Sequence, residues 1–217
     1  MKNTPRIFIG NNINTGDVIP APRDVAHYLT RVMRRHDFLA FGGGREFNAE
    51  LDAAGKNFVV CDATSHADPS GNVTLYFAPI KRTDDLINMA TQMGVARFVP
   101  VITARTVAHN INWTRMAKIA TEAAEQSNRN SVPEISAPIK FSDLDLNNMV
   151  FADERTAYGR GATDGRGATH ILVGPEGGFS DDEFAALDAA GARGISLGAT
   201  ILRAELAAAV ALARVAP

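Results

Sequence analysis

From Val73 to the end of the chain, strand-like and helix-like segments alternate. The strand-like segments are short apolar runs, and the last two are each followed by a glycine. Between the runs, apolar residues recur every three or four positions, which indicates amphipathic helices. Such alternation predicts a mostly parallel α/β sheet, because parallel strands need crossover connections. The predicted strands are 73–80, 95–102, 150–152, 171–173 and 195–197, and the predicted helices are one capped by Thr83 and stopped by Gly94, one over 113–124 and one over 203–215.

Residues 1–70 have a different texture, with short strands separated by turn residues. The triple glycine after Phe41 predicts a hairpin between Phe41 and Phe47. One helix is predicted over 24–34, with Val25, Tyr28, Leu29 and Val32 on its apolar face. Short strands with a single helix favour a small β-barrel. Turn formers and small residues at 66–72 then place a domain boundary near residue 70.

Composition limits the class of protein. The single cysteine, Cys61, excludes a disulfide framework and a cysteine-based zinc cluster, and we expect it to be a buried strand residue. A net charge of −2 argues against a nonspecific DNA coat, although it permits a local basic patch. Because the sequence shows neither a signal peptide nor an apolar run long enough for a membrane span, we expect a soluble cytoplasmic protein without a membrane partner.

The loop after the strand at 171–173 contains a complete helix start. Ser180 is the predicted N-cap, and Glu183, three residues later, completes a capping box. Phe179 and Phe184 occupy the positions of a hydrophobic staple. The sequence therefore predicts a loop fixed at its helical end, and its glycines let a ligand approach the backbone closely.

A second glycine-bearing loop follows the strand at 195–197. Loops at the carboxyl ends of strands form the ligand crevice of open α/β sheets, so two of them predict a nucleotide-sized site. The alternative is a pair of tight turns that bind nothing. Neither loop has the spacing of a dinucleotide-binding or Walker A motif, which disfavours NAD and ATP.

Three polar clusters each have two interpretations. Glu125, Gln126 and Arg129 project together from a helix end, as part of a site or as an ordinary polar terminus. The group Arg31, Arg34, Arg35 and His36 is either a phosphate-binding patch or a solvated surface. The arginine- and glycine-rich stretch 155–167 is either a mobile surface loop or an RNA contact.

Several segments, taken together in this order and spacing, carry a family resemblance. Each alone is a weak signal. They are Pro5-Arg6-Ile7-Phe8, His27-Tyr28-Leu29-Thr30-Arg31-Val32-Met33-Arg34, Ala123-Ala124-Glu125-Gln126-Ser127-Asn128-Arg129 with Val132-Pro133, the stretch 174–180, and Leu197-Gly198 with Ile201-Leu202-Arg203-Ala204-Glu205.

Over nearly its whole length the chain resembles the RsmE methyltransferases of the SPOUT class, which methylate N3 of a uridine in 16S ribosomal RNA. The resemblance implies an N-terminal PUA-like β-barrel at 1–70 that binds RNA. It also implies a SPOUT domain at 71–217, an α/β fold with a trefoil knot. The implied methyl donor is S-adenosyl-L-methionine (SAM), the implied assembly is a homodimer, and the implied partner is 16S rRNA or the small ribosomal subunit. No metal is implied.

Methyl transfer to uracil N3 needs hydrogen-bond donors and a proton acceptor, and the sequence offers candidates for both. Arg203 and Arg129 would donate hydrogen bonds to the uracil carbonyls, and Glu205 would orient an arginine or, like Glu176, accept the proton. The implied SAM-binding residues are Leu172, Gly174, Glu176, Gly177, Leu197, Gly198, Ile201, Leu202 and Arg203, and the expected RNA contacts are Arg6, Arg31, Arg34, Arg35 and Gln126.

The chain departs from the family pattern at Thr200, where an arginine is usual, and at Leu206, where a threonine is usual. Met89 and Gln92 replace a customary lysine and glutamate. These departures keep two alternatives open, an RNA- or ribosome-binding protein with weak or no catalysis and a methyltransferase for another RNA base.

Overall fold

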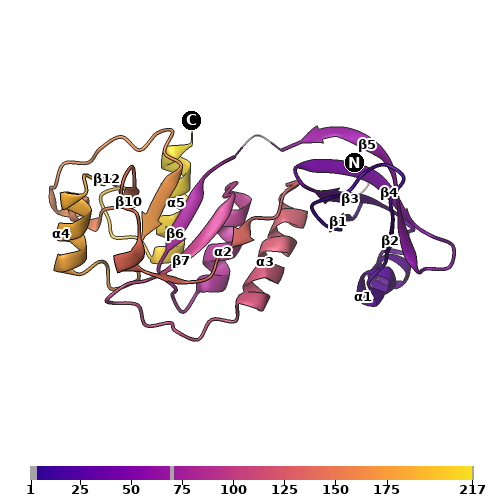
Figure 1. Ribbon diagram of the computed structural model, residues 1–217, viewed down its shortest axis with the longest axis horizontal. Helices are drawn as coiled ribbons and strands as arrows, with labels where there is room; N and C mark the ends of the chain where they lie inside the picture. The colour runs from indigo at the N-terminus through magenta and orange to yellow at the C-terminus, as the bar shows by residue number, and fades with distance from the viewer. Residues whose placement is uncertain (1–3, 69–70, 217) are drawn as a thin grey trace. The chain divides into compact units, whose positions relative to one another are not determined.

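A computed structural model describes residues 4–68 and 71–216 of the chain. These residues form two compact units, one of 4–68 with 124–132 and one of 71–123 with 133–216 (Figure 1). The short segment 124–132 thus packs with the first unit, although it comes after residues 71–123 of the second unit in the sequence. Each unit has its own sheet.

The first unit is built on a five-stranded sheet with the order β1-β3-β4-β5-β2. The predicted hairpin is confirmed, because Gly42 pairs with Arg45 across the two-residue loop Gly43-Gly44. Both loop glycines have positive φ, 59° and 81°, which suits the tight turn of a twisted hairpin. The elements are β1 (Arg6–Phe8), β2 (Val18–Pro20), α1 (Arg23–His27), η1 (Tyr28–Met33), β3 (Asp37–Gly42), β4 (Arg45–Leu51) and β5 (Asn57–Ala67).

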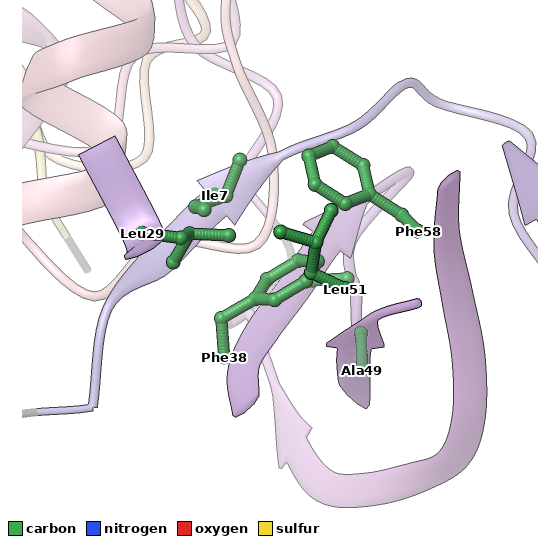
Figure 2. Packing of buried hydrophobic residues seen from close by; sticks show 7 residues of the cluster. Ile7, Leu29, Phe38, Ala49, Leu51 and Phe58 are labelled. Carbon is green, nitrogen blue, oxygen red and sulfur yellow. The ribbon is translucent and has the colours of Figure 1, made fainter. Parts of the chain in front are cut away.

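The predicted helix at 24–34 is an α-helical turn followed by a π-helical one, α1 and η1. The wider π turn breaks the three-and-four spacing on which the predicted apolar face depended. Leu29 is fully buried, but Tyr28 and Val32 are 43% and 62% exposed, so that part of the prediction is wrong. Figure 2 shows Leu29 reaching the core of the sheet, which contains Ile7, Phe38, Ala49, Leu51 and Phe58.

The second unit contains a parallel sheet with the order β12-β10-β11-β6-β7-β8, and β9 also pairs with β7. The prediction of a parallel α/β sheet is confirmed. The strands are β6 (Thr74–Phe77), β7 (Arg97–Ile102), β8 (Glu134–Ile135), β9 (Ile139–Lys140), β10 (Val150–Ala152), β11 (His170–Val173) and β12 (Arg193–Ile195), and the helical elements are α2 (Thr83–Gln92), α3 (Trp113–Gln126), η2 (Phe141–Asp143), η3 (Glu154–Tyr158), α4 (Asp181–Ala189) and α5 (Ala204–Val215).

Helices cover both faces of this sheet. On one face, Phe184 and Leu187 of α4 pack with Phe151 of β10 and Leu172 of β11. On the other, α5 contacts β10, β11 and α2. Because side chains alternate along a strand, each strand contributes to both layers.

Three local predictions need correction. Thr83 is the first residue of α2 and not its N-cap, because its hydroxyl bonds the backbone of Ile80 instead. The last strand is Arg193–Ile195 and not 195–197, because Ser196 turns the chain by accepting a hydrogen bond from Gly198 N at 3.3 Å. Cys61 lies in a strand as expected, but it is only half-buried.

Candidate active site

The loops after β10, β11 and β12 meet at the carboxyl edge of the parallel sheet and line one pocket. Residues from 152–157, 173–179 and 197–207 contribute to it. Ligands of open α/β sheets bind at this edge, where the strands end and the loops diverge. The sequence predicted the second and third of these loops and missed the first.

The loop after β11 is fixed at its helical end by the predicted capping box. The Ser180 hydroxyl accepts a hydrogen bond from Glu183 N at 3.2 Å, and the Glu183 carboxylate accepts one from Ser180 N at 2.8 Å. The other Glu183 oxygen accepts from Ala104 N at 2.7 Å, which ties the loop after β7 to the same helix start. Phe179 and Phe184 stack edge-on with their ring centroids 5.6 Å apart. Both the capping box and the staple are confirmed.

A side chain would clash at one glycine of this loop and would be tightly packed at another. Gly178 has φ +69°, and a Cβ there would lie 2.3 Å from Glu154 Oε1. At Gly174 a Cβ would lie 3.1 Å from the Phe179 ring. The backbone itself therefore forms this wall of the pocket, which leaves its amide groups accessible to a ligand.

The structure places most of the predicted SAM-binding residues on the pocket wall, and their binding role stays a prediction. Leu172 is fully buried in the core behind the wall. Gly177 lines a neighbouring hollow, and Arg203 is the exposed residue that precedes α5. The pocket is lined by Gly174, Glu176, Leu197, Gly198, Ile201 and Leu202.

The first loop contributes Asp153, Glu154, Thr156 and Ala157 to the pocket, and sequence reasoning missed all four. The available signal was the position of Asp153 directly after a strand of the parallel sheet. The Asp153 side chain is only 1% exposed.

Arg155 and Arg160 belong to the arginine- and glycine-rich stretch whose role the sequence left open. In the structure both pair with acids, Arg155 with Asp153 and Asp188, and Arg160 with Asp188 at 2.8 Å. The Arg155 guanidinium donates to Asp188 and lowers the pKa of that carboxyl, with Arg160 adding to the effect. In turn, the Asp153 and Asp188 carboxylates raise the pKa of Arg155. These two arginines therefore hold the first loop against α4.

Glu205 is 7% exposed in the first turn of α5, and its carboxylate accepts a hydrogen bond from Arg82 Nη1 at 3.3 Å. Arg82 also pairs with Asp85 at 2.7 Å. The sequence did not single out Arg82, because its partner lies 123 positions away.

Arg6, an expected RNA contact, is held inside the first unit. Its side chain is 9% exposed and its Nε pairs with Glu46 at 3.0 Å. The remaining guanidinium hydrogens bond to the carbonyls of Ala124, Glu125 and Arg129 and to the side chain of Asn130. Arginine has five N–H donors, and all five are used here. These bonds give Arg6 a structural role, which is to anchor the segment 124–132, and its RNA contact stays a prediction.

The basic group near η1 is more open. Arg31 and Arg34 are exposed, whereas Arg35 pairs with Asp37. Arg34 has φ 53° and ends the π turn, so helical spacing does not place it on one face with Arg31. Gln126 is exposed and lines a groove in the first unit.

Arg129 also belongs to the first unit. Burial lowers the pKa of its guanidinium, against an opposing effect of Asp68, and its Nη2 donates to Ser131 Oγ at 3.1 Å. Glu125 Oε1 accepts from the backbone N of Phe8 at 3.1 Å. Of the trio predicted to project together, Glu125 and Arg129 thus bond within this unit.

Within residues 4–68 and 71–216, no helix is long and apolar enough to cross a membrane. In the same residues, no three His, Cys, Asp or Glu side chains are grouped in a way that would hold a metal ion.

Comparison with known proteins places the chain in a family. A model of the RNA methyltransferase domain matches residues 67–216. The ribosomal RNA small subunit methyltransferase E of Rickettsia conorii is 34% identical, over 97% of this chain and 94% of its own length. The protein of the same name from Synechocystis is 32% identical, over 87% of this chain and 69% of its own length.

Solved structures share the fold. The crystal structure of ribosomal RNA small subunit methyltransferase E from Neisseria gonorrhoeae, bound to S-adenosyl methionine, has a TM-score of 0.83 at 24% identity, with 97% of this chain and 96% of that chain covered. A probable rRNA-methyltransferase from Porphyromonas gingivalis has a TM-score of 0.79 at 27% identity, with 96% and 95% covered. The chain belongs to the ribosomal RNA small subunit methyltransferase E family.

Proposed function

We propose that this chain transfers the methyl group of SAM to N3 of a uridine in 16S rRNA. The observation that carries the proposal is the pocket formed by the loops after β10, β11 and β12, in a chain that belongs to a family of rRNA methyltransferases. The target is the free rRNA or the assembled small subunit.

The pocket residues fit SAM. Ile201, 52% exposed, and Leu197 and Leu202 give an apolar surface for the adenosine. The glycine-built wall offers backbone amide and carbonyl groups for its polar edges. Glu154 and Glu176 on the same pocket attract the positive sulfonium.

When bound, SAM supplies an electrophilic methyl group, and the protein must position the uracil N3 in line with it. The N3 proton must leave, and negative charge that develops on the flanking carbonyls needs donors. We assign the donor role to Arg203, which is exposed beside the pocket loop, and to Arg129. Because Glu205 is buried and bound to Arg82, we assign it to orienting that arginine, which leaves Glu176 to accept the proton.

We also propose the finer architecture. The five-stranded sheet of the first unit supports a PUA-like RNA-binding domain at 1–70. Its RNA contacts are Arg31, Arg34 and Arg35, together with Gln126 from the segment 124–132 of the same unit. The parallel sheet and its carboxyl-edge loops support a trefoil-knotted SPOUT domain at 71–217. In this proposal the enzyme is a cytoplasmic homodimer.

Methyl transfer from tritiated SAM to rRNA that lacks the modification tests the proposal. We expect label at N3 of one uridine, located by mapping the methylated nucleotide. Arg203→Ala should reduce turnover at least tenfold, whereas Arg214→Ala, an exposed arginine at the other end of α5, should leave it unchanged. Failure of the folded protein to label rRNA or small subunits would refute the activity.

A non-catalytic RNA-binding protein is the second candidate, favoured by Thr200 on the pocket wall and by Leu206, which is 46% exposed. Calorimetry with SAM separates the two, because a relic pocket binds SAM poorly. Mapping the label to another base would instead indicate a different methyltransferase specificity.

A further inference from the structure

A second hollow adjoins the pocket at the carboxyl edge of the sheet. It is lined by the loops that follow β6 and β7, which contribute Lys81 and residues 104–107, and by Glu176 and Gly177 from the loop after β11. Glu176 lines both this hollow and the pocket. A ligand in the hollow would therefore lie next to a ligand in the pocket.

Two cations of the hollow are not neutralised. Among the described residues, no carboxylate lies within ion-pair distance of Lys81 or Arg105. Arg82, the neighbour of Lys81, pairs by contrast with both Asp85 and Glu205. The positive charge of the hollow thus remains available to an anion.

Arg105 is also held in position. Its Nη1 donates a hydrogen bond to the Gly177 carbonyl at 2.8 Å. Its stem packs against Gly177, where a Cβ would lie 3.6 Å from Arg105 Cβ and Cδ. A guanidinium fixed through one nitrogen keeps further N–H donors for a phosphate.

We propose that this hollow binds a backbone phosphate of the RNA beside the target nucleotide, through Lys81 and Arg105. The inference rests on the proposed function. Charge distinguishes the two neighbouring sites. Apart from Glu176, which lines both, the pocket has the carboxylate of Glu154, which suits a sulfonium, whereas the hollow has Lys81 and Arg105, which suit a phosphate. In this proposal the phosphate contact holds the RNA next to the pocket.

The test measures the KM for RNA in methyl transfer from 0.05 to 0.3 M salt with Lys81→Gln, Arg105→Gln and the double variant. Losing one phosphate contact should raise the KM about fourfold near 0.15 M salt and lower the slope of log KM against log salt by about 0.7. The affinity for SAM should not change in Lys81→Gln. The control is Lys118→Gln, which changes an exposed lysine on α3. Lys81→Arg keeps the positive charge, so its KM should lie within about twofold of the wild-type KM.

An unchanged KM and salt slope in Lys81→Gln would overturn the inference, as would an equal loss in Lys118→Gln. If the wild-type protein transfers no methyl group, the proposed function fails first. The phosphate contact is then measured as the salt dependence of RNA binding by fluorescence anisotropy, with the same variants and the same expected slope change. A wild-type slope that Lys81→Gln does not alter would refute the contact in that case too.

Discussion

Arg155 donates two hydrogen bonds to the buried carboxylate of Asp153, from Nε and Nη2, each nitrogen lying 2.8 Å from an Asp153 oxygen. Its terminal nitrogens also reach both oxygens of Asp188 at 3.0 Å, and its guanidinium lies 4.0 Å from the centroid of the Phe184 ring. Asp153 lines the pocket, and both Asp188 and Phe184 belong to α4. The Arg155 side chain therefore fixes the pocket wall that contains Asp153 to α4, the helix that follows the loop after β11.

Replacing Arg155 with methionine should weaken both the fold and the pocket. The substitution leaves Asp153, 1% exposed, without its main partner, and removing one member of a buried pair costs about 3 kcal/mol. Urea unfolding measures this loss, and calorimetry should show weaker SAM binding.

Arg160→Met is the matched control for that variant. Arg160 lies 3.6 Å from Asp153 and is 44% exposed, so its loss should cost no more than about 1 kcal/mol. Equal destabilisation by the two variants would show that Arg155 has no special role.

Acid should weaken the contact between Arg155 and Asp188. Hydrogen bonds from Arg155 and Arg160 lower the pKa of Asp188 in the folded protein. A lowered folded-state pKa stabilises the protein above the unfolded value, near about 4, and this stabilisation is lost as the pH falls through the folded value. Because Asp188 is 36% exposed, solvent screening limits the effect to about 1 kcal/mol or less.

Asp188→Asn measures this contribution. The variant should be less stable than the wild type at pH 6, and the difference should shrink between about pH 4 and pH 2. Urea unfolding across this range gives the comparison. A difference that stays constant would contradict the assigned linkage.

The features that the sequence predicted well are local ones. Ser180 and Glu183 bond to each other's backbone within one helical turn, so two residues three positions apart carry the whole signal. The Gly43-Gly44 turn likewise depends only on φ values that favour glycine. The parallel sheet was predicted from short apolar runs that alternate with segments in which apolar residues recur every three or four positions, and both patterns are local.

The features that it missed depend on residues distant in sequence. Arg6 is an internal anchor because its acceptors lie 40 and 118 to 124 positions away, and no local pattern distinguishes it from a solvent-exposed arginine. Arg155 finds Asp188 across 33 positions for the same reason. The π turn at Tyr28–Met33 was also missed, because a spacing of three and four residues between apolar positions assumes that every turn is α-helical.

The wall of the pocket should not tolerate a methyl group at Gly178. Gly178→Ala places a Cβ 2.3 Å from Glu154 Oε1 at φ +69°, and the left-handed backbone alone costs about 1 kcal/mol. Either the loop or Glu154 must move, so we expect SAM affinity, measured by calorimetry, to fall at least tenfold.

Gly191→Ala is the control for the cost of placing an alanine in the left-handed backbone conformation. Gly191 has φ +70°, but no atom lies within 4 Å of the position that a Cβ would take there, so the substitution should cost stability without a clash. It should leave SAM affinity unchanged. Similar SAM affinities in the two variants would mean that Gly178 is needed for its backbone conformation alone.

Glu183 should contribute more to stability than Ser180, although both belong to the capping box. Ser180→Ala removes one N-cap acceptor and should lower the free energy of unfolding by about 1 kcal/mol. Glu183→Ala removes the acceptor of both Ser180 N and Ala104 N at a site 7% exposed, and should cost about 2 kcal/mol or more. The control is Asp182→Ala in the same turn, an exposed carboxylate that should cost only about 0.5 kcal/mol through the helix dipole. Chemical denaturation of the three variants without ligand gives the ranking, and a Glu183→Ala loss no larger than that of Asp182→Ala would contradict the bridge between the loops after β7 and β11.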